Sequence, residues 1–246
     1  MKIYTNSKLI QQKQRIGTIA SMVGFTIMLI SFFVSWEPDR ALIAWVGMLI
    51  GLGIAMFGTY HVNRWLRPPL AHDVLAKSLE KISGRYFLFN HIGLIPHLLL
   101  TPKGLMAIKA KKYEGPVSYD AENERWIGKF SLWRLYTTGL TAEGLGDPSE
   151  EITKLRNDVL AWLQVHAPEL ADDIPVAGIA LFTAPKVTLN ISDEPPIAIA
   201  QPDTIKEVVQ KRFKREKPLR KNVYRQLRDL LIAEAKEVGV MEKDEK

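Results

Sequence analysis

The chain has 246 residues, of which 47% are hydrophobic, and its formal net charge is +6. It contains no cysteine, which excludes disulfides, thiolate nucleophiles and every cysteine-based zinc or iron–sulfur site. Beyond residue 60 there are 28 Lys and Arg residues against 25 Asp and Glu residues. This excess is too small for a global field that holds nucleic acid, so any such role must rest on a local patch.

Two long apolar segments lie near the start of the chain. Residues 16–36 and 41–63 contain no charged side chain, and each is long enough to cross a hydrocarbon core of ~30 Å at ~1.5 Å per residue. A cleaved signal peptide is the alternative for the first segment, but its apolar region spans only roughly 7 to 15 residues and ends in a small-residue cleavage site. We therefore predict a transmembrane hairpin at 16–63, with spans at 16–36 and 41–60.

Basic residues flank this hairpin on its outer sides. They are Lys2, Lys8, Lys13 and Arg15 before the first span, and Arg64 and Arg67 after the second. The intervening loop 37–40 has one Arg against two acidic residues. Since basic flanks stay on the cytoplasmic side, we predict a multi-pass membrane protein with two spans. Its N-terminal segment 1–15, its soluble domain and both termini are expected to be cytoplasmic.

Small residues recur every four positions in the second span, at Gly47, Gly51 and Ala55. Such a stripe lets another helix approach closely. It can pack against the first span of the same chain, or it can form a homodimer with a second copy. The lipid bilayer is the first predicted partner, and the homodimer is the second.

The soluble part alternates between helical and extended patterns. After Pro68-Pro69, apolar residues fall at helical spacing over 70–82. The predicted strands are 86–90, 94–101, 105–111, 117–119, 126–130 and 176–183, and the two around Pro102-Lys103-Gly104 form a hairpin. Residues 132–146 are expected to be a loop. Helices are predicted to begin at Asp147 and, through a capping box, at Thr204.

Four blocks of this part carry a family resemblance. They read YFLFNHIGL at 86–94, IPHLLLTPKGLMAIKAKKYEGPV at 95–117, DPSEE at 147–151 and IPVAGIALFTAP at 174–185. Together they resemble the nuclease-related domain (NERD) family of the PD-(D/E)xK restriction-endonuclease-like superfamily, and the second block is the specific one.

The resemblance implies an α/β domain at 64–200 with a restriction-endonuclease-like mixed sheet flanked by helices. This domain follows the transmembrane helical hairpin. Basic C-terminal helices at 201–238 and a disordered tail at 239–246 complete the chain.

The family holds Mg²⁺ between an Asp of one strand and a Glu of the next, with a Lys two residues after that Glu. Residues two apart on a strand share a face, which explains the spacing. In this sequence the Asp position is Pro96, the Glu position is Lys109, and the catalytic Lys position is Lys111. Asp73, near the start of the preceding helix, is the candidate substitute acid. Because Lys109 would repel a divalent cation, we expect no metal and no other cofactor, and we interpret the domain as a pseudoenzyme.

Other chemistry-bearing residues have simpler interpretations. His97 occupies the family's His position, but a lone His in an apolar strand is expected to be a hydrogen-bonded core residue. Lys109 and Lys111 could bind a phosphate, and the favoured alternative is that both reach water at the strand end near Glu114 or Glu124.

A sharper excess of charge lies at 206–228, where ten Lys and Arg residues face two Glu residues. A solvated helix face, anionic lipid headgroups and a nucleic-acid backbone are the three open explanations. The predicted anion-binding residues are Lys109, Lys111, Lys211, Arg212, Lys214, Arg215, Arg220 and Lys221.

The function predicted from these patterns is a membrane-anchored cytoplasmic NERD-like module that binds or scaffolds a partner and has no nuclease activity. Nucleic acid and anionic lipid headgroups are the candidate ligands. The alternative is an active Mg²⁺-dependent nuclease that uses non-standard acids, for which Asp73, Glu114 and Asp120 are the nearest candidates.

Overall fold

The computed structural model describes residues 1–240 except 81, 83, 94, 129–143 and 192–193. These residues divide into two compact units. One is a helical unit at Lys8–Leu70, and the other is an α/β unit that combines Met1–Ser7 with the described residues from Ala71 onward. The α/β unit is therefore assembled from chain on both sides of the helical unit.

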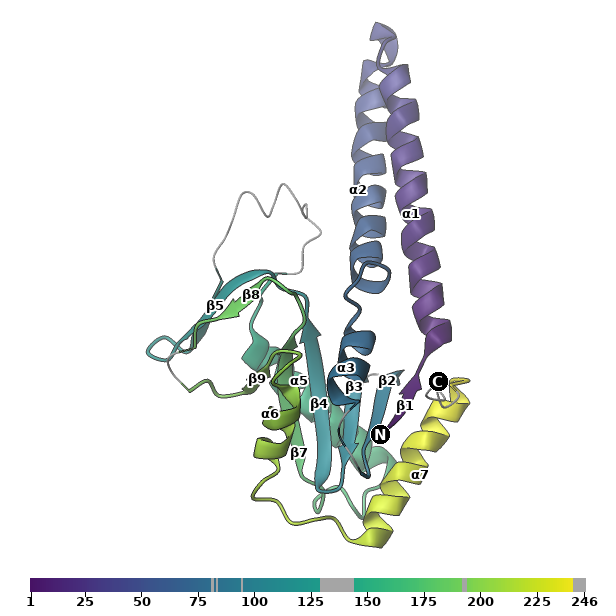
Figure 1. Cartoon of the computed structure of the whole chain (residues 1–246). Coiled ribbons are helices and arrows are strands. Elements are labelled where there is room, and N and C mark those ends of the chain that lie inside the picture. The colour runs from purple at the N-terminus through teal and green to yellow at the C-terminus, as the bar shows by residue number, and fades with distance from the viewer. Residues whose placement is uncertain (81, 83, 94, 129–143, 192–193, 241–246) are drawn as a thin grey trace. The chain divides into compact units, whose positions relative to one another are not determined.

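The helical unit is a pair of long helices (Figure 1). Helix α1 (Ser7–Val34) and helix α2 (Ala41–Trp65) are joined through the 3-10 helix η1 (Pro38–Arg40). Both are long and apolar enough to cross a membrane, and their outer surfaces carry large apolar side chains such as Leu42, which is 78% exposed. The two predicted spans are thus confirmed as helices of membrane-spanning length and composition.

Small residues line the contact between α1 and α2. Gly24 lies so close to α2 that a Cβ placed on it would be 2.3 Å from the backbone nitrogen of Ala55. A Cβ on Gly51 would likewise lie 2.7 Å from Met28 Cγ. The predicted stripe therefore packs within the hairpin. A homodimer through Gly47, Gly51 and Ala55 stays a prediction, and it would compete with α1 for the same surface.

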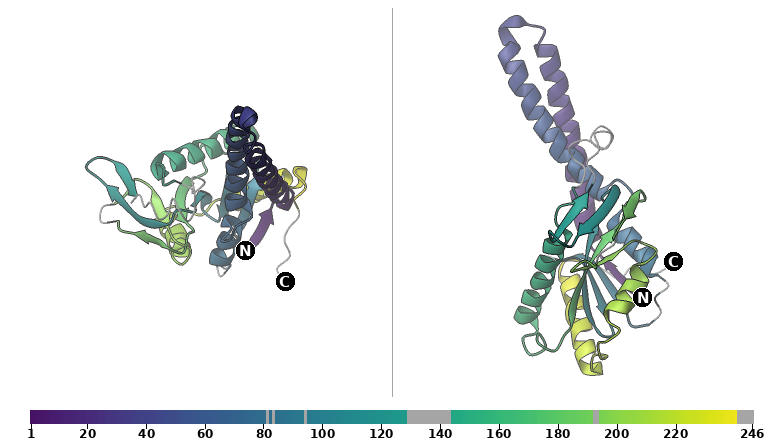
Figure 2. Two further views of the ribbon diagram at one scale, coloured as in Figure 1. Left: turned by 90° about the horizontal axis from the view of Figure 1, so that it is seen from above. Right: turned by 90° about the vertical axis from the view of Figure 1, so that its left-hand side faces the viewer.

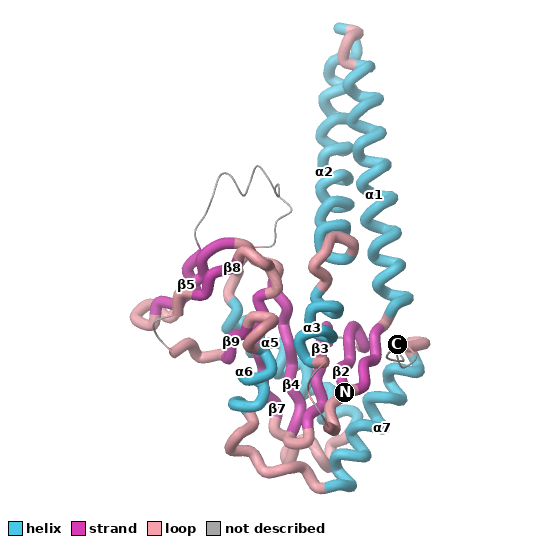
Figure 3. Tube along the Cα trace, in the orientation of Figure 1, coloured by secondary structure: helices cyan, strands magenta, loops and turns pink. Residues whose placement is uncertain are grey.

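A mixed six-stranded sheet forms the centre of the α/β unit, and its strands lie side by side in Figure 3. Its order is β1-β2-β3-β4-β7-β9. The pairs β1/β2, β4/β7 and β7/β9 are parallel, whereas β2/β3 and β3/β4 are antiparallel. The strands are β1 (Lys2–Thr5), β2 (Phe87–Ile92), β3 (Ile95–Thr101), β4 (Gly104–Lys111), β7 (Val176–Phe182) and β9 (Ala198–Ala200). The predicted α/β class with a mixed sheet is confirmed.

Helices cover both faces of this sheet (Figure 2). Helices α5 (Pro148–His166) and α7 (Lys221–Glu237) pack on one face, and α3 (Ala71–Leu79) and α6 (Ile205–Arg212) pack on the other. Successive side chains of β4 enter different cores, since side chains alternate between the two faces of a strand. Leu105 and Ala107 belong to the core under α5 and α7, whereas Met106 and Ile108 belong to the core under α3 and α6.

A second, three-stranded sheet has the order β6-β5-β8. Its strands are β5 (Gly115–Asp120), β6 (Arg125–Gly128) and β8 (Val187–Leu189), with β5/β6 antiparallel and β5/β8 parallel. The predicted strands at 117–119 and 126–130 therefore leave the main sheet. Most of the predicted loop at 132–146 lies outside the described residues.

The Pro102-Lys103-Gly104 turn joins β3 to β4 as predicted. Gly104 has a φ of +153°, and a Cβ there would lie 2.3 Å from the Pro175 carbonyl oxygen, so the turn requires glycine. Lys103 Nζ donates to the Phe213 carbonyl oxygen at 2.8 Å. This lysine thus places a cation at the end of α6, where the helix dipole favours positive charge.

Strand β1 was not predicted. It lies at the edge of the sheet and runs parallel to β2, with Lys2 N donating to Tyr86 O at 3.0 Å and Asn6 N donating to Asn90 O at 3.1 Å. The Tyr4 ring stacks on Phe89 with centroids 5.2 Å apart. Strand β1 precedes α1, and β2 comes after α2 in the chain. The chain segments on the two sides of the hairpin therefore pair in one sheet.

The first prediction concerns β1. Replacing the buried Tyr4 by Ala should lower the free energy of unfolding of the α/β unit by about 3 kcal/mol, since the Phe89 ring loses its stacked partner and a cavity is left. Ile3→Ala on the opposite, half-buried face should cost less than half as much. Urea unfolding of the full chain in detergent, followed by tryptophan fluorescence, measures both. Equal effects of the two variants would contradict the role of Tyr4 as the anchor of β1.

Candidate functional site

The predicted site lies at the end of β4, where Lys109 and Lys111 project toward the start of α5. Both share the face of Leu105 and Ala107, which α5 covers. Asp147 caps this helix by accepting from Ser149 N and Glu150 N, and the cap places Glu151 in the first turn. Glu151 Oε1 accepts from Lys111 Nζ at 2.5 Å, and Glu151 Oε2 lies 3.3 Å from Lys109 Nζ. One carboxylate therefore bridges the two lysines.

The bridge is unequally exposed. The Lys111 side chain is 2% exposed, whereas those of Lys109 and Glu151 are 26% and 31% exposed. A buried ammonium is very unfavourable without a counter-charge, so Glu151 compensates Lys111. The amino end of α5 favours the carboxylate in turn, because the helix dipole is positive there.

The loop before α5 approaches this bridge closely. Gly146 has a φ of +59°, and a Cβ at this position would lie 2.9 Å from Glu151 Oε1 and 3.5 Å from Lys111 Nζ. On the other side of β4, Thr183 N donates to the Lys111 carbonyl oxygen at 2.9 Å. Lys111 is thus held through both its backbone and its side chain.

The expectation that Lys109 and Lys111 reach water near Glu114 or Glu124 was wrong for Lys111. Its ammonium is buried, and its partner is Glu151. Sequence reasoning missed Glu151 because the acids of DPSEE were assigned only to the helix start. The signal that could have found it is the need of two neighbouring lysines on one strand face for a counter-charge.

Pro96 and Asp73, the other two predicted positions, are not members of the ion group formed by Lys109, Lys111 and Glu151. Pro96 shares the sheet face of Leu98, but the β3/β4 pairing ends at Leu98 and Ala107, before it reaches Pro96 and Lys109. A proline there agrees with the end of the ladder, since it has no N–H to donate. Asp73 lies on α3 with its side chain 61% exposed, and its carboxylate lies 3.7 Å from His72 Nε2.

Asp120, a candidate acid of the nuclease alternative, acts in a turn. Its carboxylate accepts from Glu122 N, Asn123 N and Asn123 Nδ2. The hydrogen bonds from Asn123 lower the pKa of Asp120, because they favour the charged form. The carboxylate oxygens are therefore engaged in shaping the β5/β6 turn. Glu114 is half-buried between β4 and β5.

The prediction of a hydrogen-bonded core role for His97 is confirmed. His97 is 2% exposed, and its Nδ1 lies 2.8 Å from Asn90 Oδ1. Asn90 Nδ2 donates to Thr5 Oγ1 at 3.0 Å, so the amide oxygen is the acceptor and His97 Nδ1 carries the proton. This chain of contacts ties β3 through β2 to β1.

The remaining anion-binding candidates lie on the surface. Lys211 and Arg212 end α6, Lys214 and Arg215 lie in the following loop, and all four side chains are exposed. Arg220 and Lys221 begin α7 and are exposed as well. Of the eight predicted residues, Lys109 and Lys111 are engaged by Glu151 and the other six face solvent.

The bridge suits an anion better than a divalent cation. Two ammonium groups and one carboxylate sum to a formal charge of +1, whereas Mg²⁺ prefers several oxygen ligands and usually one or two carboxylates. Among the described residues, no group of three or more His, Cys, Asp or Glu side chains could hold a metal ion. A cation at Glu151 would have to displace both lysines.

The second prediction tests this bridge. Glu151→Gln keeps the shape of the side chain but leaves the buried Lys111 charge uncompensated, so the free energy of unfolding should fall by about 3 kcal/mol. Glu150→Gln, an exposed change in the same helical turn, should alter it by less than about 0.5 kcal/mol. Adding Lys111→Met to Glu151→Gln should restore most of the loss, since it removes the buried charge. Urea unfolding of the full chain in detergent measures all three, and a double variant as unstable as Glu151→Gln would refute the pairing.

Comparison with known proteins adds no further identification of the site. No protein-family model, no curated protein and no solved structure matches this chain. The resemblance of residues 86–117, 147–151 and 174–185 to the NERD family stays a prediction from the sequence.

Proposed function

We propose that this chain is a membrane-anchored binding module whose α/β domain descends from a restriction-endonuclease-like, NERD-type nuclease and no longer cleaves nucleic acid. The observation that carries the proposal is the Glu151 bridge between Lys109 and Lys111. Lys111 stands at the family's catalytic Lys position and Lys109 at its metal-binding Glu position. Glu151 pairs with both of them.

Electrostatic repulsion disfavours a divalent cation at this position. A site that holds a divalent cation on phosphate needs an excess of negative charge before the metal arrives. If this chain aligns with the NERD family as proposed, Lys109 stands where the family has its metal-binding Glu, so a positive charge replaces a negative one. Pro96 stands where the family has its metal-binding Asp, so a second carboxylate is lost. At ~4 Å a second like charge repels by several kcal/mol even at an effective dielectric near 20. Metal-assisted hydrolysis by the inherited route is therefore disfavoured at its first step.

Anchoring is supported by the hairpin and by β1. If α1 and α2 cross a bilayer, the strand before α1 and the strand after α2 must lie on the same side, because they pair in one sheet. The basic flanks at 2–15 and 64–67 favour the cytoplasmic side. A domain fixed in this way stays near the inner leaflet, which carries anionic lipid.

The ligand surface of this proposal is the exposed basic set at 211–221. Anionic lipid headgroups contribute about 1 kcal/mol per nearby basic residue, and a nucleic-acid backbone would bind with a strong dependence on salt. Aromatic residues near this surface are few, and Phe213 is buried, so stacking on nucleic-acid bases has little support here. Contact through phosphate groups is the shared chemistry of both ligands.

The third prediction is the absence of cleavage. The full chain in detergent, incubated with single- and double-stranded DNA and RNA and with Mg²⁺ or Mn²⁺, should give no more product than the Lys111→Ala variant. The reason is that both lysines and Glu151 form a closed ion group rather than a metal site. Gel electrophoresis of end-labelled substrates measures the products. Metal-dependent cleavage that disappears in Lys111→Ala would establish the nuclease alternative instead.

The fourth prediction concerns topology. Because the natural chain has no cysteine, Asp39→Cys in η1 and Glu216→Cys in the α/β unit each introduce one exposed thiol. In intact cells an impermeant maleimide should label Asp39→Cys and spare Glu216→Cys, and inside-out vesicles should reverse the pattern. Labelling of both thiols from the same side would rule out a spanning hairpin.

A further inference from the structure

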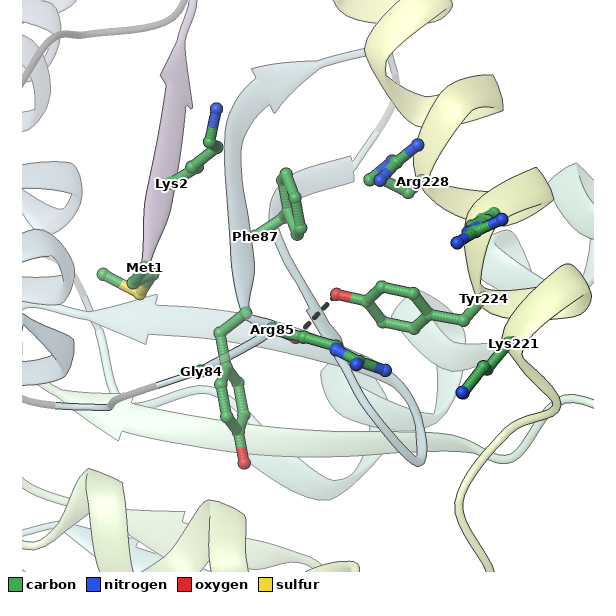
Figure 4. Close-up of a pocket in the computed structure, with 10 residues that line it drawn as sticks. Met1, Lys2, Gly84, Arg85, Phe87, Lys221, Tyr224 and Arg228 are labelled. Atoms are coloured by element: carbon green, nitrogen blue, oxygen red, sulfur yellow. Dashed lines mark hydrogen bonds between the residues drawn. The ribbon is translucent and has the colours of Figure 1, made fainter.

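A cavity of about 490 Å³ lies in the α/β unit at the start of α7, away from the Glu151 bridge in sequence (Figure 4). Three distant parts of the chain line it: the beginning of the chain with β1, residues 84–87 at the start of β2, and the first turns of α7. Its volume falls in the range of small-molecule sites, roughly 300 to 1,000 Å³.

The lining is strongly basic. Five of its ten residues carry a cationic side chain, namely Lys2, Arg85, Lys221, Arg225 and Arg228, and none of the ten described lining residues is acidic. Arg228 pairs with Asp229 at 2.7 Å, so its charge is compensated from outside the cavity. The like charges of Arg85, Lys221 and Arg225 repel one another and favour an anion between them.

The start of α7 adds to this potential. Arg220 is the N-cap residue and makes no side-chain capping hydrogen bond, and the first turn has no acidic residue. Helix starts are ordinarily stabilised by capping oxygens and acidic side chains. Here basic residues stand at the positive end of the helix dipole, an arrangement that a bound anion would stabilise.

Three aromatic residues, Tyr86, Phe87 and Tyr224, also line the cavity. The Tyr224 hydroxyl donates to the Arg85 carbonyl oxygen at 2.6 Å, which ties α7 to the turn before β2. Burial raises the pKa of Tyr224 to about 12, so this phenol stays neutral and adds no negative charge. Phe87 packs beside Tyr224 with ring centroids 6.5 Å apart. These contacts hold α7, which carries Lys221 and Arg225, against the segment that carries Arg85.

We propose that this cavity binds a small ligand with two or more phosphate groups, supplied by a soluble molecule or by a lipid headgroup. One guanidinium group can donate two parallel hydrogen bonds to phosphate oxygens. Arg85 and Arg225 line the cavity from two different parts of the chain, the segment before β2 and helix α7. A ligand with a single negative charge would balance only one of the three cations Arg85, Lys221 and Arg225. The proposal shares Lys221 with the basic surface described above, but it does not rest on the loss of nuclease activity.

The test uses the full chain in detergent, with tripolyphosphate and ATP as soluble probes. Isothermal titration calorimetry at constant ionic strength with EDTA should show saturable binding of at least one probe, and sulfate at the same ionic strength should bind more weakly. Arg85→Gln and Arg225→Gln, both exposed and therefore tolerated by the fold, should each weaken affinity at least tenfold, about the effect of one charge-assisted hydrogen bond. Arg125→Gln, an exposed change on β6, should keep the affinity within twofold.

A second arm separates the two sources of phosphate. Full-length protein in nanodiscs with and without cardiolipin, whose headgroup carries two phosphates, is compared by thermal unfolding. A rise in the melting temperature that depends on cardiolipin and is lost in Arg85→Gln assigns the cavity to a lipid headgroup, whereas binding of tripolyphosphate or ATP assigns it to a soluble ligand. No binding in either arm, or an equal loss in Arg125→Gln, overturns the proposal.

Discussion

The buried ammonium of Lys111 is the constraint on which the centre of the α/β unit depends. A charge that is 2% exposed at the end of β4 requires a negative partner, and α5 supplies it only if its first turn lies over that strand end. The Asp147 cap and the close approach of Gly146 serve this placement. The register of β4 beside β7 and the position of α5 are therefore coupled through one carboxylate.

A second constraint comes from connectivity. Strand β1 precedes the apolar hairpin but completes the edge of the sheet that follows it. Without β1, the N–H and C=O groups on the outer side of β2 would be unpaired, which is the usual route to unwanted strand association. A fragment that begins after the hairpin would lack Tyr4 and the Thr5 end of the contact chain to His97. The α/β unit therefore needs the chain segment before the hairpin to complete its sheet, although the helices form a separate compact unit.

Local patterns predicted the parts of the fold that depend on neighbours in sequence. Apolar length predicted both long helices, the Pro102-Lys103-Gly104 turn predicted the β3/β4 hairpin, and Asp147 predicted the start of α5. Contacts between distant residues were not predictable in this way: β1 has only four residues, and Glu151 meets the lysines across 40 or more positions. The Thr204 capping box was wrong because its hydroxyl accepts from Gln201 N, and no side-chain cap is formed at α6.

The two basic sites of the α/β unit differ in how their charge is compensated. At the end of β4 the chain supplies its own carboxylate, so the lysines are engaged in the folded state and an added anion gains little. At the start of α7 the lining offers no acidic residue among those described, and the helix begins without a side-chain cap. Self-compensated charge stabilises a fold, whereas uncompensated charge around a cavity favours a ligand. Lys109 and Lys111 thus have a structural role in the folded chain, and the cavity gathers its basic residues from β1, residues 84–87 and α7.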